Sequence, residues 1–117
     1  MSNKKLLTIA LEQLQSESVE TIRERCMRRY DNTCRPWTKD PKYNMMFLRH
    51  QEVYANDLLR ARGHLFLNEV YDMLGMSRTM NGQIVGWVWD GNTVGVEFEV
   101  IGDMVIFHVD GVILDKI

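Results

Sequence analysis

The side chains in this chain that could bind a soft metal are two cysteines and three histidines, namely Cys26, Cys34, His50, His64 and His108. A zinc site is usually built from pairs of ligands that lie two to four residues apart. No such pair occurs among these five residues. Cys26 also falls in a series of apolar residues at helical spacing, where a buried thiol is common. We therefore expect neither structural zinc nor any other cofactor.

Carboxylates near the end of the chain offer a second kind of chemistry. Glu97 and Glu99 share one face of an expected strand, and Asp110 falls in a nearby turn. Paired carboxylates can bind magnesium for nuclease chemistry. A common nuclease pattern also has a lysine close by, but none occurs between Lys42 and Lys116. A metal-dependent nuclease that uses these three carboxylates is therefore an alternative, not the leading interpretation.

A row of polar side chains is also expected on one helix face. His64, Asn68 and Asp72 follow one another at intervals of four residues, and such a row could hold a metal or transfer a proton. Polar rows on helices more often bond to adjacent loops, so we expect Asn68 to bind backbone groups of the turn after Gly75. Motifs for a serine nucleophile, a phosphate loop and a dinucleotide site are absent. We expect no enzyme.

Basic and aromatic side chains alternate between the first helical segment and the loop that follows it. Arginine and tryptophan dominate the energetics of protein interfaces, while the same side chains also suit phosphate contact and base stacking. Acidic residues dilute the cluster, and the net charge of the chain is −2. We therefore expect a protein partner, with nucleic acid as the minority alternative. The predicted partner-binding residues are Arg28, Arg29, Arg35, Trp37, Lys39 and Tyr43.

Apolar spacing predicts a single α+β domain over residues 1–117. Residues 1–30 are predicted to be helical, and residues 31–44 form a loop that contains both prolines. Residues 45–75 read as one long helix, which either bends at Gly63 or packs its two halves against different neighbours, and which ends at Gly75.

Residues 82–114 read as an antiparallel meander of three to four strands. The dipeptides Asp90-Gly91 and Gly102-Asp103 are typical of hairpin turns. Alternating apolar residues between these turns predict one buried and one solvated face. The expected fold therefore packs the N-terminal helices on one face of a small C-terminal sheet.

Charge is distributed unevenly along the chain. Residues 1–64 hold 12 Lys and Arg against 8 Asp and Glu, whereas residues 65–117 hold 2 against 8. Such polarity favours a partner that meets one half, or head-to-tail self-association, or it reflects solvated surface alone. No apolar run is long enough to span a membrane. Two cysteines without an export signal indicate a reducing, cytoplasmic setting, and the oligomeric state stays open.

Several spaced residues in the second half carry a family resemblance. They are Tyr54 and Leu58, the segment from Leu67 to Gly75, and then Gly82 with Gly86-Trp87. From about Val53 to Phe107, the chain resembles an uncharacterised family of unknown function that is carried by Firmicutes phages and mobile elements. The resemblance implies a phage or prophage setting, in the host cytoplasm. It provides no catalytic residue to transfer, and it leaves the N-terminal helices without a match.

These observations lead to one expectation and two alternatives. We expect a small, non-enzymatic phage or mobile-element accessory protein that binds another protein, as an inhibitor of the anti-CRISPR type would when it occludes a host defence nuclease complex. A virion or assembly component is the first alternative. The metal-dependent nuclease is the second.

Overall fold

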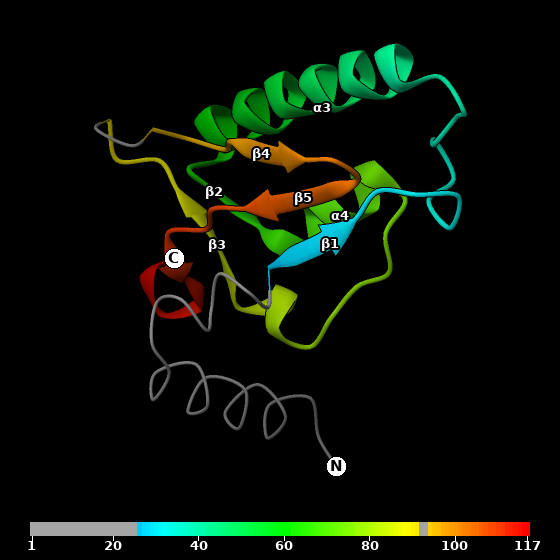
Figure 1. Cartoon of the computed structure of the whole chain (residues 1–117). Coiled ribbons are helices and arrows are strands. Elements are labelled where there is room, and N and C mark those ends of the chain that lie inside the picture. The colour runs from blue at the N-terminus through cyan, green and yellow to red at the C-terminus, as the bar shows by residue number, and fades with distance from the viewer. Residues whose placement is uncertain (1–25, 92–93) are drawn as a thin grey trace.

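The computed structural model describes residues 26–91 and 94–117. Residues 1–25, which hold most of the helical segment predicted over 1–30, lie outside the described residues. Of the helices described, none combines the length and the apolar composition needed to cross a membrane. The elements shown in Figure 1 are β1 (Met27–Arg29), α3 (Pro41–Arg62), β2 (His64–Phe66), α4 (Leu67–Leu74), β3 (Val85–Val88), β4 (Phe98–Ile101), β5 (Met104–Phe107) and β6 (Gly111–Val112), with 3-10 turns at Asn81–Gln83 and Leu114–Lys116.

The described strands form two antiparallel three-stranded sheets, with the orders β1-β5-β4 and β2-β3-β6. The α+β class is confirmed, but the single C-terminal meander is wrong, because strands and helices alternate along the chain. β3 pairs with β2 and β6 instead of β4, so Asp90-Gly91 does not join neighbouring strands. The turn at Gly102-Asp103 does form a hairpin, with Ile101 opposite Met104.

The end of the predicted first helical segment is a strand. Arg28 lies opposite Val105 in β5, and the Tyr30 amide donates to the Asp103 carbonyl at 2.7 Å. The spacing of Cys26 and Tyr30, four residues apart, predicts one face of a helix. In the structure these two residues flank β1, and both are buried. Residues at i and i+4 also share a strand face, since strand side chains alternate with a period of two. Because residues 27–29 pair with β5, this segment forms a strand and not the end of a helix.

The predicted helix over 45–75 is two helices separated by a short strand. Gly63 adopts a left-handed conformation (φ 85°), and its amide bonds to the Leu59 carbonyl, which ends α3. At the other end, the Asp40 carboxylate accepts from the amides of Lys42 and Tyr43, so α3 begins inside the predicted loop 31–44. The left-handed stop predicted at Gly75 is confirmed (φ 73°).

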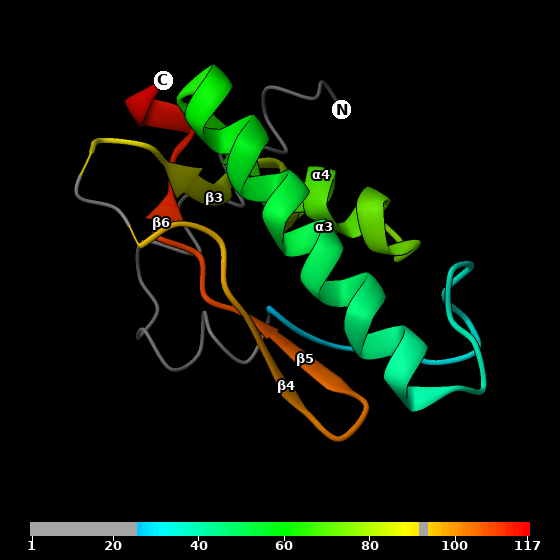
Figure 2. The same ribbon diagram turned by 90° about the horizontal axis from the view of Figure 1, so that it is seen from above.

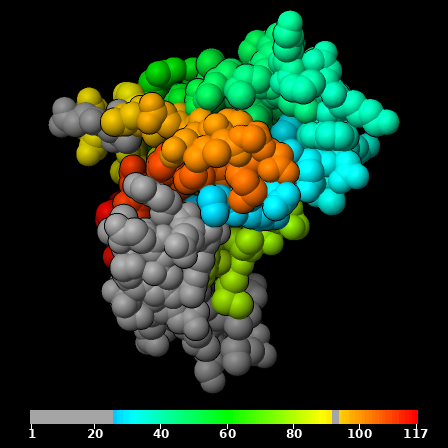
Figure 3. Space-filling model, in the orientation of Figure 1, coloured from blue at the N-terminus to red at the C-terminus, as the bar shows by residue number. Residues whose placement is uncertain are grey.

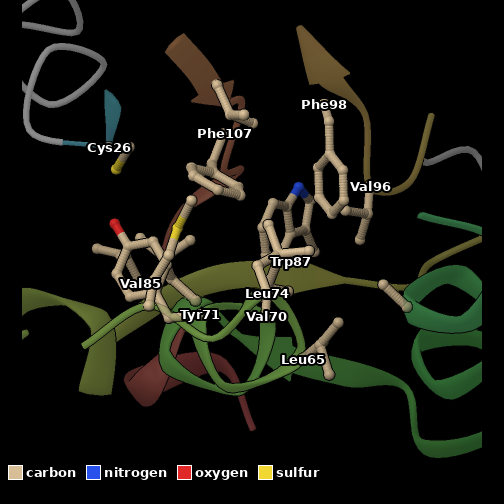
Figure 4. Packing of buried hydrophobic residues seen from close by; sticks show 14 of the residues in the cluster. Cys26, Leu65, Val70, Tyr71, Leu74, Val85, Trp87, Val96, Phe98 and Phe107 are labelled. Atoms are coloured by element: carbon tan, nitrogen blue, oxygen red, sulfur yellow. The ribbon is translucent and has the colours of Figure 1, made fainter. Parts of the chain in front are cut away.

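Both sheets and α4 share one core. Trp87, Tyr71 and Phe107 are fully buried, and the ring centroids of Tyr71 and Phe107 lie 5.4 Å apart in an edge-to-face arrangement. The Trp87 indole N–H donates to the His108 carbonyl at 2.9 Å, which ties β3 to the segment after β5. Figure 4 shows side chains from α4, β3 and the β4–β5 hairpin pointing into this one cluster.

Asn68 fixes the loop that leads from α4 to the second sheet. Its amide group donates to the Thr79 carbonyl and accepts from the Thr79 amide, each at 2.9 Å. The predicted bonding of Asn68 to the turn after Gly75 is therefore confirmed. A Cβ at Gly82 would lie 2.0 Å from the Asn68 Oδ1 atom, so only glycine allows this close approach.

We expect Asn68→Ala to lower the free energy of unfolding by about 2–4 kcal/mol, because it leaves a buried amide and a buried carbonyl of Thr79 without partners. Urea unfolding followed by circular dichroism measures this change. The matched control is Asn32→Ala, at an exposed position, which should shift the value by less than about 0.5 kcal/mol. Equal effects of the two substitutions would contradict a structural role for Asn68.

Candidate functional site: an apolar pocket beside the basic loop

Helix α3 lies beside β4 on the side that faces away from β5, where a neighbouring strand would otherwise pair (Figure 1), and Figure 2 shows the same helix from above. Asn56 donates to the Val96 carbonyl at 3.0 Å and accepts from the Val96 amide at 2.8 Å. The Phe98 amide donates to Glu52 at 2.7 Å, and Arg49 donates to the Phe98 carbonyl at 2.9 Å. Side chains of α3 therefore satisfy backbone groups that an edge strand leaves open.

A pocket of about 370 Å³ lies where this row of hydrogen bonds ends, at the N-terminal turns of α3. This volume falls within the range of small-ligand sites. Its walls come from three segments: the loop after β1, the start of α3, and the β4–β5 hairpin. Figure 3 shows that hairpin in orange between α3 above it and β1 below it. Residues that line the pocket include Tyr30, Trp37, Lys39, Met45, Leu48 and Val100.

The loop between β1 and α3 is held in place by its own hydrogen bonds. The Thr38 amide donates to the Asn44 Oδ1 atom at 2.9 Å, and the Asn44 Nδ2 atom donates to the Thr38 carbonyl at 2.8 Å. The Trp37 amide bonds to the Cys34 carbonyl at 3.0 Å. These contacts place the half-buried indole of Trp37 in the pocket wall and leave Lys39 exposed beside it.

The six predicted partner-binding residues do not form one patch. Trp37 and Lys39 line the pocket. Arg29 lies next to it, since its guanidinium pairs at 3.2 Å with Asp103, another lining residue. Tyr43 is 46 % exposed on the first turn of α3.

Two arginines of the set lie near the segment that follows α4. The Arg28 guanidinium stands 4.7 Å from the centre of the Tyr71 ring and donates to the carbonyl and the hydroxyl of Ser77. The Arg35 backbone packs so closely on Gly75 that a Cβ at Gly75 would lie 2.9 Å from its amide nitrogen. The Arg35 side chain is nevertheless exposed.

Positive charge near the pocket is only partly compensated. Within residues 26–91 and 94–117, the structure shows no ion pair for Arg35, Lys39 or Lys42. All three side chains are exposed. Among the described residues, Lys39 is therefore an unpaired cation in the pocket wall, while Asp103, another lining residue, is already paired with Arg29.

Tyr30 is a buried phenol in the pocket wall. It is only 4 % exposed, and its hydroxyl has no hydrogen-bond partner among residues 26–91 and 94–117. Burial, together with the neighbouring Cys34 and Tyr43, raises the pKa of Tyr30 to about 12. Its ring stacks on Phe47 with the centroids 6.1 Å apart. Within the described residues, the side chain of Tyr30 is thus held by packing alone, and its hydroxyl is an unsatisfied polar group.

Of the carboxylates and soft ligands considered for metal chemistry, Glu97, Glu99 and His108 line one pocket, which does not include Asp110. Glu99 pairs with His108 at 2.6 Å, and Asp110 accepts from the Val88 amide at 3.0 Å. His64 lies in β2 instead of on α4, so the helical row with Asn68 and Asp72 does not form. In the part of the chain that the structure describes, no group of three or more His, Cys, Asp or Glu residues could hold a metal ion.

Sequence reasoning missed the walls that α3 and β4 contribute. Arg49, Glu52 and Asn56 are spaced i, i+3 and i+7, so they share one helix face. This polar row faces Val96 and Phe98, in the segment that leads into β4 and at its start, and it was the signal that α3 covers a sheet edge. Gly95 fits this reading, because a Cβ there would lie 2.4 Å from the Asn56 Oδ1 atom.

We expect Tyr30→Phe to raise the free energy of unfolding at neutral pH by about 1 kcal/mol, because it removes a buried hydroxyl that has no partner. The substitution should also weaken the loss of stability in alkali. The folded protein holds the Tyr30 proton more tightly than the unfolded chain, so this contribution is complete below the ordinary pKa of 10.0 and is lost as the pH rises toward about 12.

Urea midpoints measured from about pH 8 to pH 11 test both parts of this prediction. Tyr43→Phe, at an exposed position, is the control and should change little. Destabilisation of Tyr30→Phe by more than about 1 kcal/mol would show that the hydroxyl is hydrogen-bonded in solution.

Comparison with known proteins places the chain in a family without assigning it a function. A model described as a family of unknown function (DUF6353) matches residues 3–114. The match therefore includes the N-terminal half, which the resemblance over Val53 to Phe107 left out, and it carries no phage or Firmicutes origin. No curated protein and no solved structure was found to match. The chain belongs to DUF6353, a family of unknown function.

Proposed function

We propose that this protein is a small, non-enzymatic accessory protein that acts by binding another protein at the pocket beside Trp37. One observation carries the proposal: a half-buried tryptophan forms the wall of an apolar pocket of about 370 Å³. The residues that contribute most to binding in protein interfaces are enriched in tryptophan, tyrosine and arginine, and they cluster in well-packed pockets that exclude water. Exposed Lys39, which lines the pocket, would add a polar, charged group at the rim of such a contact.

A protein partner fits this surface better than nucleic acid does. Phosphate binding needs several free cations along a track, but Arg28 is engaged with Ser77, and Arg29 is paired with Asp103. Single-strand binding also needs aromatic faces open to bases, whereas Trp37 is half-buried in a concave wall. A concave, apolar surface with few cations suits an inserted side chain.

The biological setting is part of the proposal. We place the protein in the host cytoplasm, as the product of a phage or mobile element that occludes a host defence nuclease complex of the CRISPR type. The resemblance of the segment from Leu67 to Gly75 and of Gly86-Trp87 supports the setting. The positive balance of residues 1–64 supports a partner that meets that half of the chain. Occlusion requires binding alone and no catalytic group.

We expect Trp37→Ala to weaken partner binding by about 30-fold, since truncation of an interface tryptophan typically costs about 2 kcal/mol or more. Arg35→Ala should have a smaller effect, because Arg35 packs beside Gly75 and does not line the pocket. Affinity purification from a bacterial host lysate, followed by mass spectrometry, identifies the partner. Biolayer interferometry with the purified partner then gives the affinity of each variant.

Lys116→Ala serves as the matched control, because Lys116 is an exposed cation near the C-terminus. It should bind as the unchanged protein does. Thermal melts of all variants separate lost binding from lost folding. Unchanged affinity of a folded Trp37→Ala variant would contradict the proposal, and a large closed multimer in light scattering would favour an assembly component instead.

A further inference from the structure

The direction of the backbone groups on β4 follows from the pairing of β5 with β1. The Phe107 amide donates to the Cys26 carbonyl, and the Tyr30 amide donates to the Asp103 carbonyl. Residues 103, 105 and 107 therefore direct their N–H and C=O groups toward β1, since these directions alternate along an antiparallel strand. Val100 lies opposite Val105, so its own N–H and C=O groups point away from β5.

Val96 and Phe98 point their backbone groups to the same outer edge, and α3 satisfies both of them through Asn56, Glu52 and Arg49. The row stops there. For Val100, the described part of the chain offers no hydrogen-bond partner on this edge. Of the α3 residues that line the pocket, Pro41, Met45 and Leu48 have no side-chain hydrogen-bond donor, and Asn44 is bonded to Thr38.

We propose that the pocket takes an extended, acidic segment of the partner, which adds one rung of β pairing to Val100 and inserts a bulky apolar side chain. This inference rests on the proposed function and deepens it, because it names the chemistry of the bound segment. Pairing of an extended segment with an open sheet edge gives affinity through the backbone, and pockets for alternate side chains give specificity.

The pocket and the edge are arranged for this mode of binding. Val100 belongs both to the pocket wall and to the open edge. A residue that pairs directly opposite Val100 therefore has its own side chain on the same face as Val100, next to the cavity, because directly opposite residues share one face of a sheet. Leu48 and Met45 give the cavity an apolar side. A leucine, methionine or phenylalanine side chain fits these walls.

Charge selects the flanking residues of the segment. Lys39 lines the pocket, and Lys42 follows the lining residue Pro41. Both lysines are exposed, and the described residues supply no carboxylate that forms an ion pair with either. Asp103, the lining carboxylate, is neutralised by Arg29. An acidic segment thus gains favourable contacts on entry, whereas a basic one meets like charge. Such complementarity argues for an acidic partner segment over an uncharged one.

The test uses a fluorescein-labelled synthetic peptide with a central phenylalanine, a valine on each side, and aspartates at both ends. We expect saturable binding by fluorescence anisotropy, with amide chemical-shift changes at Lys39, Val100 and Gly102. Replacing the central phenylalanine by alanine, or the aspartates by lysines, should each weaken binding at least about tenfold. Methylation of the amide that pairs with Val100 should do the same.

Two protein variants locate the site. Met45→Trp fills the pocket from α3 and should abolish peptide binding, while Met46→Trp, on the next residue and outside the lining set, should not. Val100→Pro removes only the outward N–H group, which edge positions tolerate. It should weaken binding at least about tenfold. Met45→Trp keeps the test decisive if Val100→Pro fails to fold.

Absence of peptide binding at millimolar concentration, or binding that Met45→Trp leaves unchanged, would overturn the inference. A dimer that forms without peptide and is lost in Met45→Trp would overturn it too, because a second copy would then occupy the pocket. If the peptide fails but Trp37→Ala still weakens capture of the purified partner, the protein-binding function stands and only the extended-segment mode is wrong. If both fail, the proposed function falls as well.

Discussion

Hydrogen bonds from the side chains of α3 to the outer edge of β4 govern the arrangement of this domain. Asn56, Glu52 and Arg49 take the place of a neighbouring strand by satisfying the backbone groups of Val96 and Phe98. An edge strand without such cover is a template for pairing with other chains. The cover also fixes the position of α3 over the hairpin. Because the row stops before Val100, a pocket remains between the start of α3 and the hairpin tip.

The residues that carry the family resemblance are structural. Asn68 holds the loop at Thr79, and Glu69 accepts from the Phe66 amide while it pairs with Arg62 at 2.7 Å. Trp87 fills the core and donates to the His108 carbonyl. These contacts hold the fold together, and a fold does not by itself assign a function. The proposed function therefore rests on the loop and the pocket.

The pocket draws its properties from segments that are far apart in the chain. Trp37 and Lys39 come from a loop closed by Thr38 and Asn44, while the facing wall comes from the β4–β5 hairpin. The proposal of polypeptide recognition rests on an apolar cavity that lies beside an open backbone edge and an unpaired lysine within the described residues. Burial raises the pKa of the Tyr30 phenol in the pocket wall to about 12.

The sequence by itself determined the features that a few neighbouring residues encode. The helix end at Gly75 and the turn at Gly102-Asp103 follow from glycines that accept a left-handed backbone, and the α+β class follows from apolar spacing. At Gly63, where the sequence predicted a bend or a change of neighbours within one helix, the structure ends α3. Only the tertiary structure decided that residues 27–29 form a strand, that β3 pairs with β2 and β6, and that α3 covers β4. The physical reason is that backbone hydrogen-bonding groups are chemically alike in every strand. Which strands pair, and where an edge stays open, depends on how the whole core packs.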